Sequence, residues 1–273
     1  MSPALSAVPL AFLISNGERP NSTHLASQLA EHFRLRVVEP VFVTTETLLD
    51  SDVVDQNAFR ARHLRSATTG EVGCAIAHRN ALSSFLETSD AWCLVFEDDA
   101  RIEAVCYLRE RSKVYASVFS QERPTLVNLN ENAVPTRPAR RPKDAPQLSV
   151  PPAPPYPATA YAINRAAAAL FVSQQTPIRS QADWPRTVEK VWFYVDQHSS
   201  VTEDTDIASS IDAKGERSLV SIGTKLSVWS GTWFVLHRAA YGGLRNYWRW
   251  LILPRLAFHG DTLLARFSSI LRH

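Results

Sequence analysis

The chain has 273 residues, of which 45% are hydrophobic and 21% charged, and its formal net charge at pH 7 is +2. This length and apolar content predict one large domain, or one domain with an appendage. No stretch reaches the roughly 18 uninterrupted apolar residues that a membrane-spanning helix needs, and the N-terminus lacks the basic segment of a signal peptide. Three cysteines without metal-like spacing, Cys74, Cys93 and Cys106, indicate buried thiols in a reducing compartment. We therefore expect a cytoplasmic protein that is neither secreted nor membrane-spanning.

The first 68 residues predict a strand, a helix and a second strand, followed by an irregular segment. Residues 10–15 form an apolar run that ends in a polar turn, and a helical spacing of apolar residues follows from Pro20. Residues 36–43 indicate the second strand. Residues 44–68 are charged and irregular, and their basic part, residues 59–65, has two interpretations. It could contact a diphosphate through arginine, or it could be a solvated helix face, which is the interpretation we favour.

Residues 70–88 predict a helix, with Thr69 near its start as a cap. Gly73 would allow another backbone segment to approach the helix closely. The helix also carries Glu71 and His78. A single histidine on a helix either forms structural hydrogen bonds or lines a site, and the sequence leaves both interpretations open.

The next segment joins an apolar run to three consecutive carboxylates, Glu97, Asp98 and Asp99. Residues 92–96 are apolar and rich in aromatic side chains, which predicts a strand buried on both faces. The carboxylates would then lie at the carboxyl end of the strand, where open α/β sheets bind ligands. Three adjacent negative charges repel one another, and a hard divalent cation such as Mg²⁺ or Mn²⁺ would offset them. The alternative is a solvated acidic turn.

These two segments together resemble glycosyltransferase family 25. The resemblance lies in Gly-Glu-Val-Gly-Cys at residues 70–74, His78, and the apolar strand that ends in Glu-Asp-Asp. The family includes the lipooligosaccharide galactosyltransferases of bacterial surfaces and the collagen galactosyltransferase domains. The likeness extends from about residue 10 to about residue 211, with a poorer match in the middle. At Ala77 the chain departs from the serine that the family commonly has before the histidine.

The resemblance implies a GT-A-like α/β domain: a Rossmann-like, mostly parallel sheet flanked by helices that binds a UDP-sugar. It implies that Asp99 binds Mn²⁺ or Mg²⁺ and that Glu97 faces the ribose or a metal-bound water. Asp98 would support these two carboxylates. Three further residues would contact the donor, namely Arg19, Glu71 and His78. The match at Arg19 is loose because the paired basic residues of the family are absent, and a solvated turn arginine is the alternative.

The rest of the first 217 residues predicts further helices and strands around a proline-rich loop. Residues 135–157 contain nine of the seventeen prolines, which rules out regular structure there. The predicted helices span residues 102–120 and 165–175, and the predicted strands span residues 124–130, 158–163 and 192–195. Enzymes of this family invert the configuration at the anomeric carbon, so the resemblance implies a carboxylate base that takes the proton from the acceptor hydroxyl. This base is expected on a different segment from the metal ligand. Asp183, which precedes Trp184, is the candidate catalytic base, and Asp204 and Asp206 are the reserves.

Residues 218–273 form a tail of different composition. They hold seven basic residues, one acidic residue and four of the seven tryptophans. Apolar stripes with arginine between them are typical of helical segments that lie on an anionic membrane surface. The alternatives are a protein partner and, least favoured, nucleic acid. We expect a helical tail that holds the protein peripherally on the inner face of the cytoplasmic membrane, with no nucleic-acid partner.

Together these features predict an inverting, metal-dependent glycosyltransferase. It would transfer a sugar, expected to be galactose, from a UDP-sugar donor to a saccharide or glycolipid acceptor of lipooligosaccharide or another cell-surface glycan. Ala77 and the loose match at Arg19 motivate the alternative, a catalytically inactive relative that binds saccharide or acts as an assembly scaffold.

Overall fold

The structure, a computed structural model, describes residues 8–63, 65–119, 123–130, 145–151, 158–180, 182, 190–196 and 198–204. A six-stranded mixed sheet forms its centre, and the strands lie in the order β2-β1-β3-β6-β5-β7. All strands of this sheet are parallel except β6, which is antiparallel to both of its neighbours. The strands are β1 (Leu10–Ile14), β2 (Arg34–Val38), β3 (Trp92–Glu97), β5 (Thr125–Asn128), β6 (Ala160–Asn164) and β7 (Trp192–Val195).

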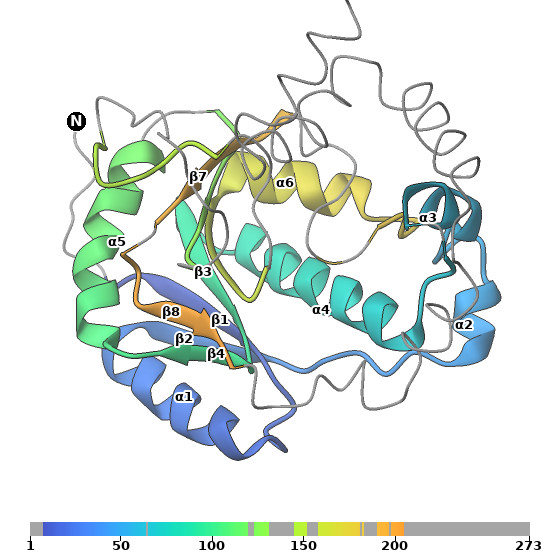
Figure 1. The fold of residues 1–273 in the computed structure, drawn as a ribbon, viewed down its shortest axis with the longest axis horizontal. Coiled ribbons are helices and arrows are strands. Elements are labelled where there is room, and N and C mark those ends of the chain that lie inside the picture. Colours follow the sequence, from blue (N-terminus) through green and yellow to red (C-terminus); the bar gives the residue numbers. More distant parts are fainter. Residues whose placement is uncertain are drawn as a thin grey trace, which may run out of the picture.

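Helices cover both faces of the sheet (Figure 1). The helices α1 (Pro20–His32) and α5 (Val105–Phe119) pack on one face, and α4 (Thr69–Leu86) and α6 (Arg165–Gln174) pack on the other. Successive side chains of a strand point to opposite faces of the sheet, so the side chains of β1 contribute alternately to the two cores. Ala11 and Leu13 belong to the core under α1 and α5, whereas Leu10 and Phe12 belong to the core under α4 and α6. The predicted α/β class, with a mostly parallel sheet flanked by helices, is confirmed.

The connections make the carboxyl ends of β1 and β3 a switch point in the sheet. From β1 the chain passes through α1 to β2 on one side, and it later returns through α4 to β3 on the other side of β1. These two helices lie on opposite faces of the sheet. In open α/β sheets the ligand crevice forms where neighbouring connections diverge in this way. The fold therefore places the acidic triplet at this switch point.

Several predicted boundaries require correction. The second strand ends at Val38 instead of residue 43, and the segment predicted to be irregular contains α2 (Thr45–Leu49) and α3 (Gln56–His63). The Thr44 side chain caps α2, and α3 buries Phe59, so a local cap and a satellite core stabilise helices that lack a long apolar period. The cap of α4 is Thr68, not Thr69.

A small second sheet also differs from the prediction. The strands β4 (Ala100–Ile102) and β8 (Val201–Glu203) pair in antiparallel fashion, so helix α5 begins at Val105 and not at residue 102. Three-residue strands carry too little periodicity to be seen in the sequence. Their pairing matters for the site because it brings residues that are about a hundred positions apart in the chain next to the acidic triplet.

The tail, residues 218–273, lies outside the described residues, and the division into a domain and a tail therefore stays a prediction. Part of the proline-rich segment is described, and Ala145 and Leu148 are buried in the core there. In the described part of the chain, no helix has the length and apolar character needed to cross a bilayer.

Gly73 provides a test of the packing between α4 and the segment after β2. A Cβ atom at this position would lie well inside van der Waals contact of the Val41 carbonyl oxygen, which confirms the predicted close backbone approach. Alanine normally stabilises a helix interior by about 0.5–1 kcal/mol relative to glycine. Here we expect Gly73→Ala to lower the free energy of unfolding by roughly 1–3 kcal/mol, because the added methyl group overpacks the contact.

Urea denaturation would measure this change. Ser84→Ala on the same helix is the matched control, since Ser84 is not fully buried and its substitution should change stability by less than about 0.5 kcal/mol. A stabilised Gly73→Ala variant would show that the contact with Val41 is absent in solution.

Candidate functional site

The candidate site is built where β1 and β3 end. Arg19 precedes α1, and its guanidinium lies 3.1 Å from the Asp98 carboxylate and 3.9 Å from that of Asp99. The Ser15 hydroxyl, just past β1, donates a hydrogen bond of 3.5 Å to Asp98. The structure therefore brings Arg19 and the acidic triplet together, and Arg19 is an ion-paired residue rather than a solvated turn arginine.

The small sheet adds two more acidic residues to the same place. The backbone N–H of Asp204 donates to the carbonyl oxygen of Asp99 at 2.8 Å. The Asp204 carboxylate in turn accepts a hydrogen bond from the Asn21 amide at 3.0 Å. Glu203 lies close enough for its charge to raise the pKa of Asp99. These two hydrogen bonds hold the end of β8 next to the start of α1, beside the acidic triplet.

The electrostatics of this cluster are dominated by Asp99. Its pKa is raised from 3.8 to about 7, chiefly by burial and next by the negative charge of Glu97, while the positive charge of Arg19 lowers it. Burial also raises the pKa of Asp98, against the lowering effect of Arg19. The Asp99 Oδ1 atom is buried and accepts no hydrogen bond from the described residues. One arginine therefore does not neutralise the cluster, and a bound cation would stabilise the ionised form.

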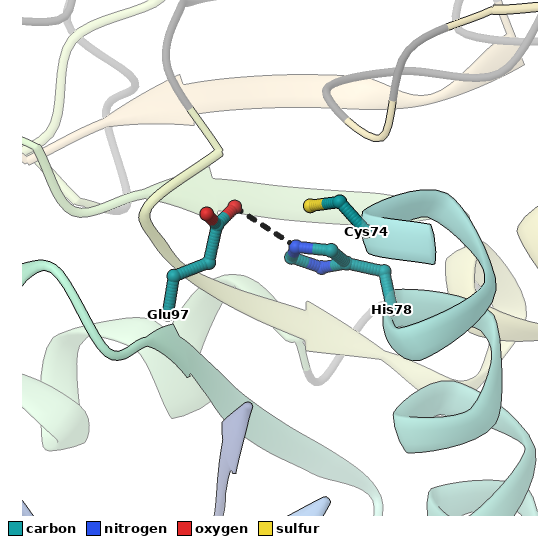
Figure 2. Close-up of side chains that lie close together, drawn as sticks. All are labelled: Cys74, His78 and Glu97. Carbon is teal, nitrogen blue, oxygen red and sulfur yellow. Dashed lines mark hydrogen bonds and ion pairs between the residues drawn. The ribbon is translucent and has the colours of Figure 1, made fainter. Parts of the chain in front are cut away.

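The third member of the triplet, Glu97, points to the opposite face of the sheet from α1. Its carboxylate lies 2.9 Å from Nε2 of His78 on α4, and Nδ1 of His78 lies 2.9 Å from the Tyr161 hydroxyl of β6. The His78 and Tyr161 rings stack at 5.7 Å between centroids. Cys74 lies one helical turn before His78 and close to both His78 and Glu97 (Figure 2). The side chain of His78 is 1% exposed, so these contacts fix its orientation.

Glu71 has a structural position at the start of α4. Its backbone and side chain form a capping box with Thr68, and its carboxylate is ion-paired with Arg65. The side chain is 2% exposed. Its carboxylate oxygens accept hydrogen bonds from these partners, and the prediction that it contacts a donor has no support from this placement.

The candidate base Asp183 and its reserve Asp206 lie outside the described residues. Asp204, the other reserve, is described and belongs to the acidic cluster. Sequence reasoning missed Glu203, although it directly precedes the reserve base Asp204. It also missed the grouping of Cys74 and Tyr161 with His78. The cysteine interpretation is correct for Cys93, which is buried, and wrong for Cys106, which is exposed.

No family model matches this chain, and no curated protein matches it. Chemically, the site offers carboxylate oxygens around a partly buried and incompletely neutralised aspartate, one arginine, and a histidine held by hydrogen bonds at both nitrogens. Carboxylate oxygens are the ligands that Mg²⁺ and Mn²⁺ prefer. The donor set at Asp99 therefore fits a hard divalent cation.

The raised pKa of Asp99 predicts a pH dependence of stability. In the unfolded chain Asp99 would titrate near 3.8 and in the folded chain near 7. Between these values the folded state binds more protons, so the free energy of unfolding should fall as the pH rises from about 4 to about 7. Urea denaturation across this window should show a shallower fall for Asp99→Asn. If the free energy of unfolding fell equally with pH in the wild type and in Asp99→Asn, the pKa of Asp99 would not be raised by the fold.

Proposed function

We propose that the chain is a metal-dependent glycosyltransferase of GT-A type that uses a nucleotide-sugar donor. The observation that carries the proposal is the acidic cluster at the switch point of the sheet, with a partly buried Asp99 that one arginine does not neutralise. A nucleoside diphosphate brings negative charge and commonly binds through a shared divalent cation. The cluster by itself would repel a diphosphate, so the cation is a requirement of the proposal.

Asp99 would hold the metal, with Asp98 in support and Glu203 adding negative charge nearby. When bound, Mn²⁺ or Mg²⁺ would stabilise the leaving nucleotide diphosphate as a Lewis acid. Arg19 would then be able to exchange its contact with Asp98 for one with phosphate oxygens, to which guanidinium groups bind bidentately. Glu97 would face the donor ribose or a metal-bound water.

The donor sugar, the acceptor and the base rest on the resemblance to family 25. That resemblance favours UDP-galactose as the donor and a surface saccharide or glycolipid as the acceptor. Asp183 stays the predicted base for an inverting transfer, and Asp204 is the reserve that lies within the described cluster. The membrane-surface role of residues 218–273 stays a prediction as well, and it would place the enzyme beside a lipid-linked acceptor.

Calorimetric titration of the full chain with UDP tests the proposal. We expect UDP to bind in the presence of Mn²⁺ and to bind at least about tenfold more weakly when the metal is removed with a chelator, because the acidic cluster then repels the diphosphate. GDP and CMP serve as controls for donor selectivity. If none of these nucleotides binds with or without Mn²⁺, the proposed function is wrong.

A further inference from the structure

A second group of metal-ligating side chains lies next to the acidic cluster but uses different chemistry. The group consists of Cys74 and His78, one helical turn apart on α4, and Glu97 at the end of β3. Residues four apart share one helix face, so the thiol and the imidazole lie on the same side of α4. One ligand atom from each residue, Sγ, an imidazole nitrogen and a carboxylate oxygen, falls within 4.8 Å of the others. Figure 2 shows all three side chains directed toward one another.

From this geometry we propose that Cys74, His78 and Glu97 form a zinc site. A thiolate, an imidazole and a carboxylate are a ligand set that suits Zn²⁺, whereas Mg²⁺ and Mn²⁺ favour all-oxygen sites. Zinc–ligand bonds of about 2.0–2.3 Å place tetrahedral ligand atoms roughly 3–4 Å apart, so side chains whose ligand atoms already lie within 4.8 Å of one another would need only a small movement to bind the ion. Three protein ligands would leave a fourth position for water or a substrate oxygen. Cys74 and Glu97 are only partly buried, so a metal ion can reach them.

Tyr161 is the second observation that supports a metal at this place. A ligating histidine usually has its other ring nitrogen held by a hydrogen bond, which fixes its orientation. Nδ1 of His78 lies 2.9 Å from the Tyr161 hydroxyl, so Nε2 is directed at Glu97. Burial raises the pKa of Tyr161 well above its ordinary value, so the hydroxyl keeps its proton and can either donate or accept. The histidine is therefore already oriented for coordination through Nε2.

The proton balance of zinc binding follows from these contacts. In one tautomer of the metal-free imidazole, Nε2 donates to Glu97 and Nδ1 accepts from the Tyr161 hydroxyl. With zinc on Nε2, the ring proton moves to Nδ1 and is donated to the Tyr161 oxygen. Cys74 binds as the thiolate, so its proton is released to solvent. Zinc binding should therefore release about one proton for each ion bound.

Titration of the metal-free full chain with Zn²⁺, in competition with a chromophoric chelator, tests the proposal. We expect one site, about tenfold weaker in Tyr161→Phe and weaker still in Cys74→Ser. Cys106→Ser is the matched control because Cys106 is exposed on α5 and distant in sequence from the group. It should bind zinc as the wild type does.

Cobalt reports on the ligands directly. The Co²⁺-loaded wild type should show a thiolate-to-cobalt charge-transfer band that persists in Cys106→Ser and disappears in Cys74→Ser. Absence of a zinc site in the wild type, absence of this band, or equal loss in the two cysteine variants would overturn the proposal. The inference does not depend on the glycosyltransferase proposal: Asp99→Asn should lose metal-dependent UDP binding and still bind zinc.

Discussion

Asp99→Asn is expected to abolish Mn²⁺-dependent binding of UDP while leaving the protein folded. The substitution keeps the size of the side chain but removes the carboxylate proposed to bind the metal. Loss of a group that only hydrogen-bonds to a metal ligand typically weakens metal binding by about tenfold to a hundredfold, and loss of a direct ligand should weaken it more. Calorimetric titration with UDP in the presence of Mn²⁺ measures the effect.

The same substitution should make the fold more stable at neutral pH, because it removes a buried charge that Glu97, Asp98 and Glu203 disfavour. Weaker binding with higher stability distinguishes a lost ligand from a damaged fold. Asp90→Asn is the matched control, since Asp90 lies before β3, at the opposite end of the strand from the triplet. It should bind UDP as the wild type does, and equal losses in both variants would contradict the role of Asp99.

Arg111→Met is expected to lower the free energy of unfolding by about 3–5 kcal/mol. The guanidinium of Arg111 on α5 donates two hydrogen bonds, of 2.7 and 2.8 Å, to the carboxylate of Asp196, which follows β7 and is fully buried. The Tyr115 hydroxyl donates a third at 2.7 Å. Methionine fills a similar volume but leaves the aspartate as an unpaired charge in the core.

Urea denaturation measures this loss. Arg109→Met serves as the control because Arg109 is exposed on the same helix, and its replacement should change stability by less than about 0.5 kcal/mol. Tyr115→Phe removes only one hydrogen bond to the carboxylate and should cost about 1.5–3 kcal/mol. A change below about 1 kcal/mol in Arg111→Met would mean that Asp196 is not held as an ion pair in solution.

Local sequence patterns correctly predicted the strands that are buried on both faces. The apolar runs of β1 and β3 are visible in the sequence because both faces of these strands are covered by helices. The acidic triplet could be placed at a strand end for the same reason. The helix with Glu71 and His78 was also recognisable, with its capping residue misplaced by one position and its end by two.

Contacts between distant segments could not be predicted in this way. Glu203 and Asp204 reach the triplet only through the pairing of two three-residue strands. Tyr161 meets His78 because β6 lies antiparallel beside β3, and nothing in the local pattern of β6 specifies its direction. Cys74 and His78 lie four positions apart on one helix, but the third member of their group, Glu97, comes from a different element. Sheet pairing therefore decides the composition of both sites.

A crystal grown with UDP and Mn²⁺ would test the central claim most directly, because manganese can be located by its anomalous scattering. The account predicts a manganese peak at coordination distance from the Asp99 carboxylate, with the UDP diphosphate on the same ion beside the ends of β1 and β3. A nucleotide bound elsewhere on the protein, or a manganese ion that Asp99 does not contact, would contradict it.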